Sequence, residues 1–251
     1  MALIDKTISK LSGNSFYKIL LYYVTVVVFG AFLFFFIPAL ALLLFIVVSG
    51  YHFGEQHWQS ELMGESKKIN LLFHLFYGLQ ILSLLFVFHI QEVQRIISDI
   101  SKINLTSYSI YLFFYFSLIG FLILCLIKYL KSKEIKKTVI QELLFLLVFA
   151  IIFKTSTLIW GFTIYFILWH SIPSMIDQIS FLYGSVTFDN FKKYFKSAFF
   201  YWIISLAGIL ILYIIFRNLY FFDALFFSFL AAITFPHVWV IVNMFKTKKA
   251  N

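Results

Sequence analysis

The sequence predicts an all-α fold, a polytopic membrane bundle of about eight transmembrane helices. Two observations lead to this expectation. Of its 251 residues, 62% are hydrophobic and only 12% are charged, whereas about a quarter of the residues in a soluble domain are charged. In addition, apolar runs of about 18 residues or more recur between Phe16 and Phe245, as in helices that cross a bilayer. We therefore expect residues 1–251 to form one integral membrane domain.

The apolar runs place the predicted spans one after another with short connections. They are expected at residues 17–36, 37–55, 69–90, 107–130, 137–153, 156–180, 197–216 and 222–245. Each is close to the ~20 residues that a helix needs to cross a bilayer. Only Pro38 and its neighbours separate the first two spans, which predicts either a tight hairpin or one long kinked helix.

The basic residues predict the orientation of the bundle in the membrane. When Lys and Arg are counted on alternate connections between the spans, 16 lie on one side and 4 on the other. Basic residues near span ends stay on the cytoplasmic side, so we expect the N and C termini to be cytoplasmic and the chain to lie in the cell membrane. This distribution also explains the net charge of +9 without nucleic acid as a partner.

The histidines share one depth in this topology. Five of the six fall in the cytoplasmic half of the bundle, and only His89 lies at the other face. The five are His52, His57, His74, His170 and His237. Imidazole is expensive in hydrocarbon and is the commonest protein ligand for metals, so the sequence predicts a metal site. The alternative is that the first three are interfacial and that the last two hydrogen-bond to neighbouring helices.

Local sequence features refine this hypothesis. His52 and His57 are five residues apart and would point ~140° away from each other on an unbroken helix, so one of them is not expected to be a ligand unless the helix ends near Gly54. Pro173 and Pro236 lie next to the two deepest histidines. A proline frees the carbonyl four residues earlier, and broken helix geometry inside a membrane usually lines a cavity or is covered by protein.

Acidic residues are sparse inside the predicted spans. Glu142 and Asp177 are candidates to orient a ligating imidazole through its second nitrogen, or they extend to the interface. Glu55 beside His52 has the same two interpretations, with the interfacial one favoured. The chain has no phosphate-binding glycine loop, no paired-cysteine metal motif and no nucleophilic serine elbow, so we expect chemistry embedded in the membrane.

Three short segments resemble motifs of the Brp/Blh family of membrane β-carotene 15,15'-dioxygenases. They are Tyr51-His52-Phe53-Gly54-Glu55-Gln56-His57-Trp58, Leu168-Trp169-His170-Ser171-Ile172-Pro173-Ser174 and Pro236-His237. The resemblance covers most of the chain and implies non-haem iron, Fe²⁺, held by histidines. It also implies that β-carotene is split at its central double bond with dioxygen into two molecules of retinal, which would supply a retinal-binding rhodopsin.

The resemblance assigns His52 and His170 as iron ligands, and His237 matches the terminal motif. Two positions differ from the family pattern. No histidine precedes His52, where the family has a Pro-His-Gly motif, and Ser174 stands where the family has a second histidine. Coordination is therefore expected to be completed by His57, His74 or His237. The metal ligands that we predict are His52, His170, His237 and His57.

Other functions are compatible with the same residues. One is a bis-histidine haem protein that carries electrons. Another is a non-catalytic carotenoid or lipid carrier, or a degenerate homologue in which the histidines only form hydrogen bonds. A transporter is weakly supported, because few acidic residues lie within the spans.

Overall fold

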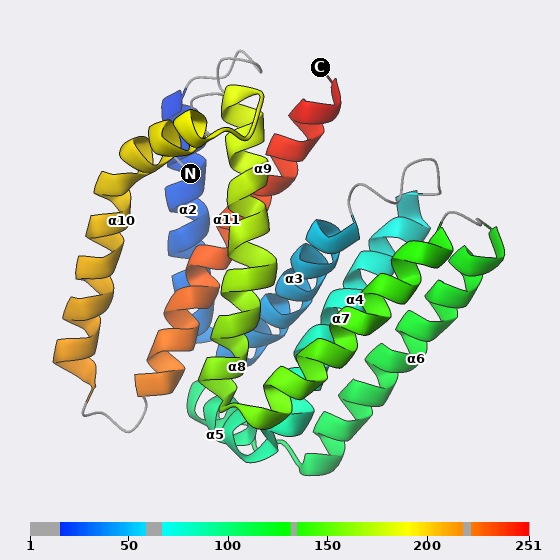
Figure 1. Ribbon diagram of the computed structural model, residues 1–251. Coiled ribbons are helices and arrows are strands. Elements are labelled where there is room, and N and C mark those ends of the chain that lie inside the picture. The colour runs from blue at the N-terminus through cyan, green and yellow to red at the C-terminus, as the bar shows by residue number, and fades with distance from the viewer. Residues whose placement is uncertain (1–15, 59–66, 132–134, 218–221, 251) are drawn as a thin grey trace. The chain divides into compact units, whose positions relative to one another are not determined.

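A computed structural model describes residues 16–58, 67–131, 135–217 and 222–250, and within these ranges the chain is helical and contains no β-strand (Figure 1). The predicted all-α fold is confirmed. The chain forms two compact units. We call Pro38–Ser171 the central unit, and Met1–Ile37 together with Ile172–Asn251 the terminal unit.

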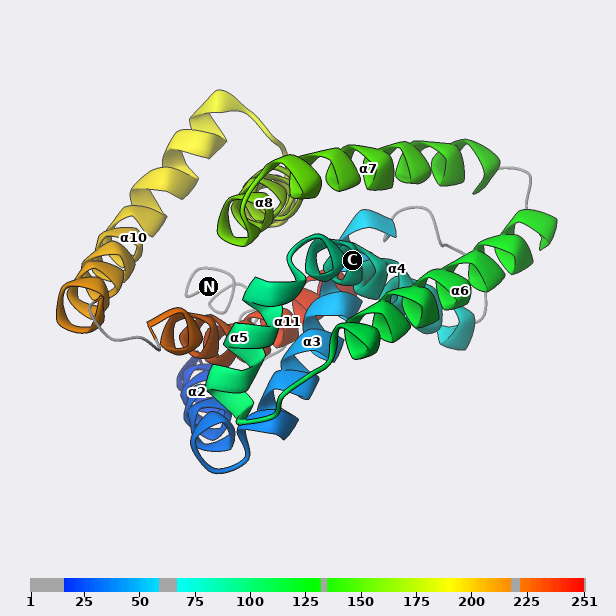
Figure 2. The same cartoon turned by 90° about the horizontal axis from the view of Figure 1, so that it is seen from below.

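The central unit is a bundle built around one helix. Its elements are α3 (Pro38–Trp58), α4 (Lys67–Phe88), α5 (Ile90–Ser101), α6 (Ser107–Lys131), α7 (Ile135–Thr155), α8 (Leu158–Tyr165) and the π-helix η1 (Phe166–Ser171). Helix α4 lies between α3 and α6 and also contacts α7 and α8 (Figure 1). The short helix α5 lies at the end of the unit where α4 finishes (Figure 2). It falls outside the predicted spans.

Helices α3 and α4 approach each other until their backbones touch. A Cβ atom added at Gly78 would lie 1.8 Å from the carbonyl oxygen of Gly50, and one added at Gly54 would lie 1.8 Å from that of His74. Small residues four positions apart are how membrane helices reach this distance. The close contact fixes the part of α3 that carries His52.

Packing and polar contacts hold α4 against its other neighbours. The buried rings of Phe73 and Tyr77 lie 5.9 and 5.5 Å from the ring of Phe121 on α6. Between the same two helices, the hydroxyl of Ser117 donates to Gln80 Oε1 at 2.9 Å and lies 2.8 Å from the hydroxyl of Ser83. Hydrogen bonds of this kind are a common way of joining membrane helices.

The terminal unit contains α2 (Phe16–Phe36), α9 (Ile172–Tyr183), α10 (Phe188–Phe216) and α11 (Phe222–Ala250). Helix α11 packs on α2, where the rings of Tyr22 and Trp239 lie 4.4 Å apart. A small core of Val240, Ile241 and Met244 on α11 packs against partly buried residues of α9. Thr187 caps α10 by accepting a hydrogen bond from the backbone N–H of Asn190 at 3.3 Å.

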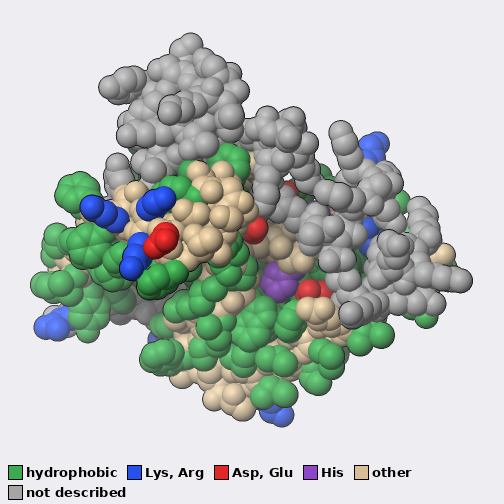
Figure 3. Space-filling model, turned by 45° about the horizontal axis from the view of Figure 1, so that its top comes forward, with side chains coloured by type: hydrophobic (Ala, Val, Ile, Leu, Met, Phe, Trp, Pro, Cys, Tyr) green, Lys and Arg blue, Asp and Glu red, His purple; other side chains and the backbone are tan. Residues whose placement is uncertain are grey.

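The helices have the length and surface of a membrane protein. Among the described residues, four helices are long and apolar enough to cross a bilayer, and α10, which bends by 41°, makes a fifth if it counts as one span. Large apolar side chains such as Phe35 (81% exposed) and Leu130 (74%) point outward. Figure 3 shows many exposed hydrophobic side chains on one face, with Lys and Arg in a few separate places. The count of eight spans and the cytoplasmic termini stay predictions.

Candidate metal centre

Two of the predicted ligands, His52 and His170, lie side by side in the central unit. His52 is on α3 and His170 is on η1, their ring centroids are 4.9 Å apart, and the ring planes make an angle of 79°. The residues are only 1% and 4% exposed. With metal–nitrogen bonds of ~2.0–2.1 Å, two imidazoles in neighbouring coordination positions have ring centroids about 4.5–5 Å apart. The spacing of this pair therefore fits a shared metal ion.

The helix that carries His170 is irregular at this residue. Thr157 caps the start of α8, the chain winds as a π-helix over Phe166–Ser171, and α9 follows from Ile172. Pro173, in the first turn of α9, has no N–H to donate to an earlier carbonyl. The sequence predicted broken helix geometry before this proline, and the π-helix confirms it. π-Helical segments inside α-helices occur frequently at functional sites.

A glutamine on α3 is bonded to the backbone of His170. The side-chain nitrogen Nε2 of Gln56 donates a hydrogen bond to the carbonyl oxygen of His170 at 2.7 Å. Gln56 follows His52 by four residues, so both side chains lie on the same face of α3. The helix that presents one imidazole is thereby tied to the backbone that presents the other.

Aromatic rings surround the His170 imidazole. Its ring centroid lies 5.1 Å from that of Phe53 on α3 and 4.8 Å from that of Phe166 on η1. The ring centroid of Tyr165 lies 5.4 Å from that of Phe53. These contacts hold the imidazole in an apolar environment in which a bound ion would be shielded from bulk water.

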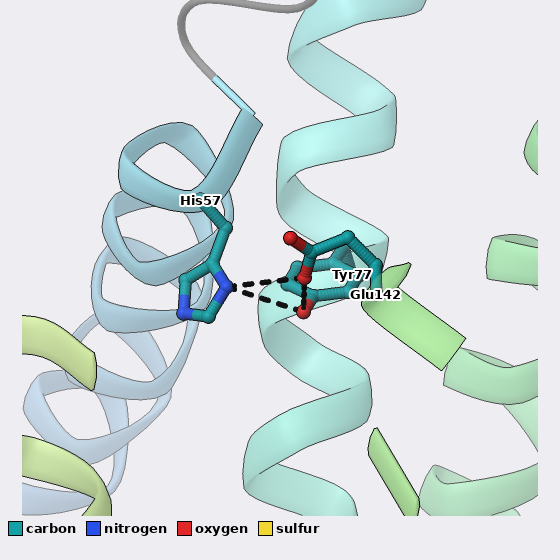
Figure 4. A network of polar contacts seen from close by, with 3 residues as sticks. All are labelled: His57, Tyr77 and Glu142. Carbon is teal, nitrogen blue, oxygen red and sulfur yellow. Dashed lines mark hydrogen bonds and ion pairs between the residues drawn. The ribbon is translucent and has the colours of Figure 1, made fainter. Parts of the chain in front are cut away.

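His57 lies in a second polar cluster of the same unit, formed with Tyr77 and Glu142 (Figure 4). Its Nδ1 lies 3.2 Å from Glu142 Oε2 and 3.3 Å from the Tyr77 hydroxyl. The Tyr77 hydroxyl also donates to Glu142. Glu142 is only 5% exposed and is bonded to an imidazole. Its predicted role of orienting a metal-ligating imidazole stays a prediction. Nε2 of His57 has no hydrogen-bond partner among the described residues.

The environment of His57 differs from that of His52. Its ring lies 5.3 Å from that of Tyr77 and 6.2 Å from that of Tyr165, whereas the His52 ring lies against His170. The sequence argument that the two histidines point in different directions agrees with this arrangement. Whether His57 is a metal ligand stays a prediction.

The cluster yields a prediction about stability. Replacing Glu142 with Leu removes the acceptor to which the Tyr77 hydroxyl donates and the carboxylate that lies 3.2 Å from His57 Nδ1. We expect a loss of about 1–3 kcal/mol in unfolding free energy, the usual cost of one orphaned buried polar group, measured as a lower midpoint of thermal unfolding in detergent. Glu92→Gln is the control, because the side chain of Glu92 is 45% exposed and lies 3.7 Å from that of His89. Equal midpoints for the two variants would contradict the prediction.

The remaining histidines of the central unit are buried as well. His74 on α4 is 8% exposed, and its ring lies 6.0 Å from that of Tyr51. His89 caps the start of α5, and its Nε2 lies 2.8 Å from the carbonyl oxygen of Phe153 on α7. The carboxylate of Glu55, which was a candidate partner of His52, accepts a hydrogen bond from the Tyr51 hydroxyl at 2.9 Å.

His237 belongs to the terminal unit. It follows Pro236 directly and is partly buried on α11. Helix α11 continues through Pro236, so this proline, unlike Pro173, does not interrupt its helix. The assignment of His237 as a ligand together with His52 and His170 stays a prediction.

Sequence reasoning missed two polar residues of the central unit. Gln56 and Tyr77 bond to His170 and to His57, respectively, and neither was a candidate. A signal existed for Gln56, because it is an uncharged polar residue one turn after His52, directly after the predicted span 37–55. Tyr77 carries no such signal, since tyrosine is common in membrane helices.

Comparisons with known proteins agree with the resemblance of the motifs. A family model described as beta-carotene 15,15'-dioxygenase matches residues 2–245, almost the whole chain. No curated protein and no solved structure matches the chain.

Proposed function

The chain belongs to the beta-carotene 15,15'-dioxygenase family, and from this premise we propose that it splits β-carotene at the central double bond into two molecules of retinal. Dioxygen supplies one oxygen atom to each aldehyde, so the two products account for both oxygen atoms and no external reductant is needed. The observation that carries the proposal is the buried His52–His170 pair, with ring centroids 4.9 Å apart.

The pair has the chemistry of an iron site. Neutral imidazoles are suitable ligands for Fe²⁺, and non-haem iron oxygenases need positions that the protein leaves open. We propose that His52 and His170 supply two ligands and that His237 supplies a third, on the argument of shared depth and of the Pro-His motif. His57 is the alternative third ligand. When bound, Fe²⁺ would activate dioxygen for attack on the polyene.

The residues around the pair have separate tasks in this proposal. Phe53 and Phe166, whose rings pack on His170, keep water away from the ion and offer an apolar surface to a hydrocarbon substrate. β-Carotene dissolves only in the bilayer, so we place the enzyme in the cell membrane. A retinal-binding rhodopsin is the partner that we propose as acceptor of the product.

The same geometry argues against a haem held between these two histidines. Imidazoles on opposite faces of a haem are separated by two metal–nitrogen bonds of ~2 Å, which puts their ring centroids about 6 Å apart with the macrocycle between them. The rings of His52 and His170 are closer than this. Expression in cells that make β-carotene distinguishes the enzyme from a non-catalytic carotenoid carrier.

Expression of the chain in bacteria that accumulate β-carotene tests the proposal. We expect the orange cells to lose colour and to contain retinal, quantified by liquid chromatography, in proportion to the amount of membrane-inserted protein. Purified protein should contain iron near one ion per chain. Unchanged pigment with well-inserted protein would refute the enzymatic proposal, and unchanged pigment with co-purifying carotenoid would support a carrier.

A further inference from the structure

The amide of Gln56 has an orientation that the structure determines. A carbonyl oxygen cannot donate a hydrogen bond, so the end of the amide that faces the carbonyl of His170 at 2.7 Å must be the NH₂ group. The amide oxygen Oε1 is then buried, and no described residue donates to it. A buried acceptor of this kind costs about 1–3 kcal/mol. An apolar side chain of similar length would avoid this cost, which favours a functional reason for glutamine at this position.

The bond acts where the helix is least regular. His170 is the fifth residue of the six-residue η1, and Pro173, three residues later, has no N–H to donate to the carbonyl of Trp169. The Gln56 amide that donates to the His170 carbonyl comes from α3, 114 residues earlier in the chain. It therefore restrains how η1 is rotated about its axis relative to α3.

That rotation sets the distance between the two imidazoles. His52 and Gln56 are one turn apart on α3, and His170 carries both the carbonyl that accepts the bond and the second imidazole. Metal sites need their ligands held within ~0.5 Å of the productive geometry. We propose that Gln56 is a positioning residue that fixes the separation of His52 and His170, a role that rests on the proposed metal site.

A matched pair of variants tests this role. Gln94 also donates from Nε2 to a backbone carbonyl at 2.7 Å, that of Leu105, and it is half-buried in the same unit. Gln56→Met and Gln94→Met therefore remove the same type of bond with the same change in side chain. The measurement is the dissociation constant of Co²⁺ for the purified protein, followed by the visible absorption of the bound ion, and it does not require enzymatic activity.

The expected result is a selective loss of metal affinity. Gln56→Met should bind Co²⁺ ~10–100-fold more weakly than the wild type, the range found when groups that support metal ligands are removed, and Gln94→Met should bind within about twofold of wild type. In a His170→Ala background, Gln56→Met should add no further loss, because both changes act on the same ligand. If Gln56→Met does not fold, Gln56→Glu, which has the same size but no amide donor, takes its place.

The experiment separates failure of the positioning role of Gln56 from failure of the proposed metal site. Equal Co²⁺ affinities for Gln56→Met and Gln94→Met would overturn the positioning role and leave the metal site intact. An additive loss in the His170→Ala background would also overturn it, because Gln56 would then act elsewhere. Wild-type protein that binds neither Co²⁺ nor Fe²⁺ would refute the proposed metal site and this role with it.

Discussion

Replacing His170 with Ala is expected to abolish retinal formation, with activity at least ~100-fold below that of the wild type. The imidazole is one of the two whose ring centroids lie 4.9 Å apart, and its loss leaves the proposed iron site without one of these two imidazoles. Loss of a ligand removes both the binding of the ion and the chemistry that depends on it. The measurement is retinal per unit of membrane-inserted protein in cells that make β-carotene.

His89→Gln is the control for this experiment. His89 is also buried, at 9% exposure, and it also contacts a backbone carbonyl, that of Phe153 at 2.8 Å. Glutamine can still donate to that carbonyl, so this variant should keep its activity. Retinal formation that persists in His170→Ala would contradict the proposed role of His170, whereas loss in both variants together with poor insertion would point to a defect of folding.

Replacing Gly78 with Val is expected to prevent the central unit from folding. A Cβ atom at this position would lie 1.8 Å from the carbonyl oxygen of Gly50, and this neighbour is backbone that cannot rotate away. The helices α3 and α4 would have to separate along their contact, and overpacking of this kind costs ~3 kcal/mol or more. The expected observation is a large loss of monodisperse protein in detergent extracts, followed by fluorescence-detected gel filtration.

Gly208→Val is the matched control for the glycine experiment. Gly208 lies within α10, and a Cβ atom added there would have no atom within 4 Å. The same change of side chain should therefore leave the yield of folded protein close to that of the wild type. A Gly78→Val variant that is as abundant and monodisperse as Gly208→Val would show that the backbone contact between α3 and α4 is not required.

The sequence was sufficient to locate the long helices because each of them contains a long run of apolar residues. The predicted span 17–36 is α2 (Phe16–Phe36), and the predicted span 107–130 is α6 (Ser107–Lys131). Helix α5 was missed for the same reason: Ile90–Ser101 is short and has a strongly polar face, so a search for apolar runs passes over it. For η1, the sequence predicted only that the helix geometry is broken before Pro173.

The depth of the histidines predicted the proximity of His52 and His170, but the supporting contacts needed the structure. Depth follows from counting residues along a span, whereas the rotation of each helix about its axis does not. The bonds from Gln56 to His170 and from Tyr77 to Glu142 join residues 114 and 65 positions apart. Such pairs depend on how the helices pack against one another, and this packing cannot be predicted from a single sequence.

Because of the π-helix, the number of residues in the segment around His170 determines the direction in which the imidazole points. A π-turn is equivalent to one extra residue wound into an otherwise regular α-helix, here between the cap at Thr157 and Pro173. Deleting one residue there would restore ordinary winding and turn the imidazole by ~100°. Relatives that keep this arrangement should therefore tolerate changes of side chain in the segment while rejecting any insertion or deletion.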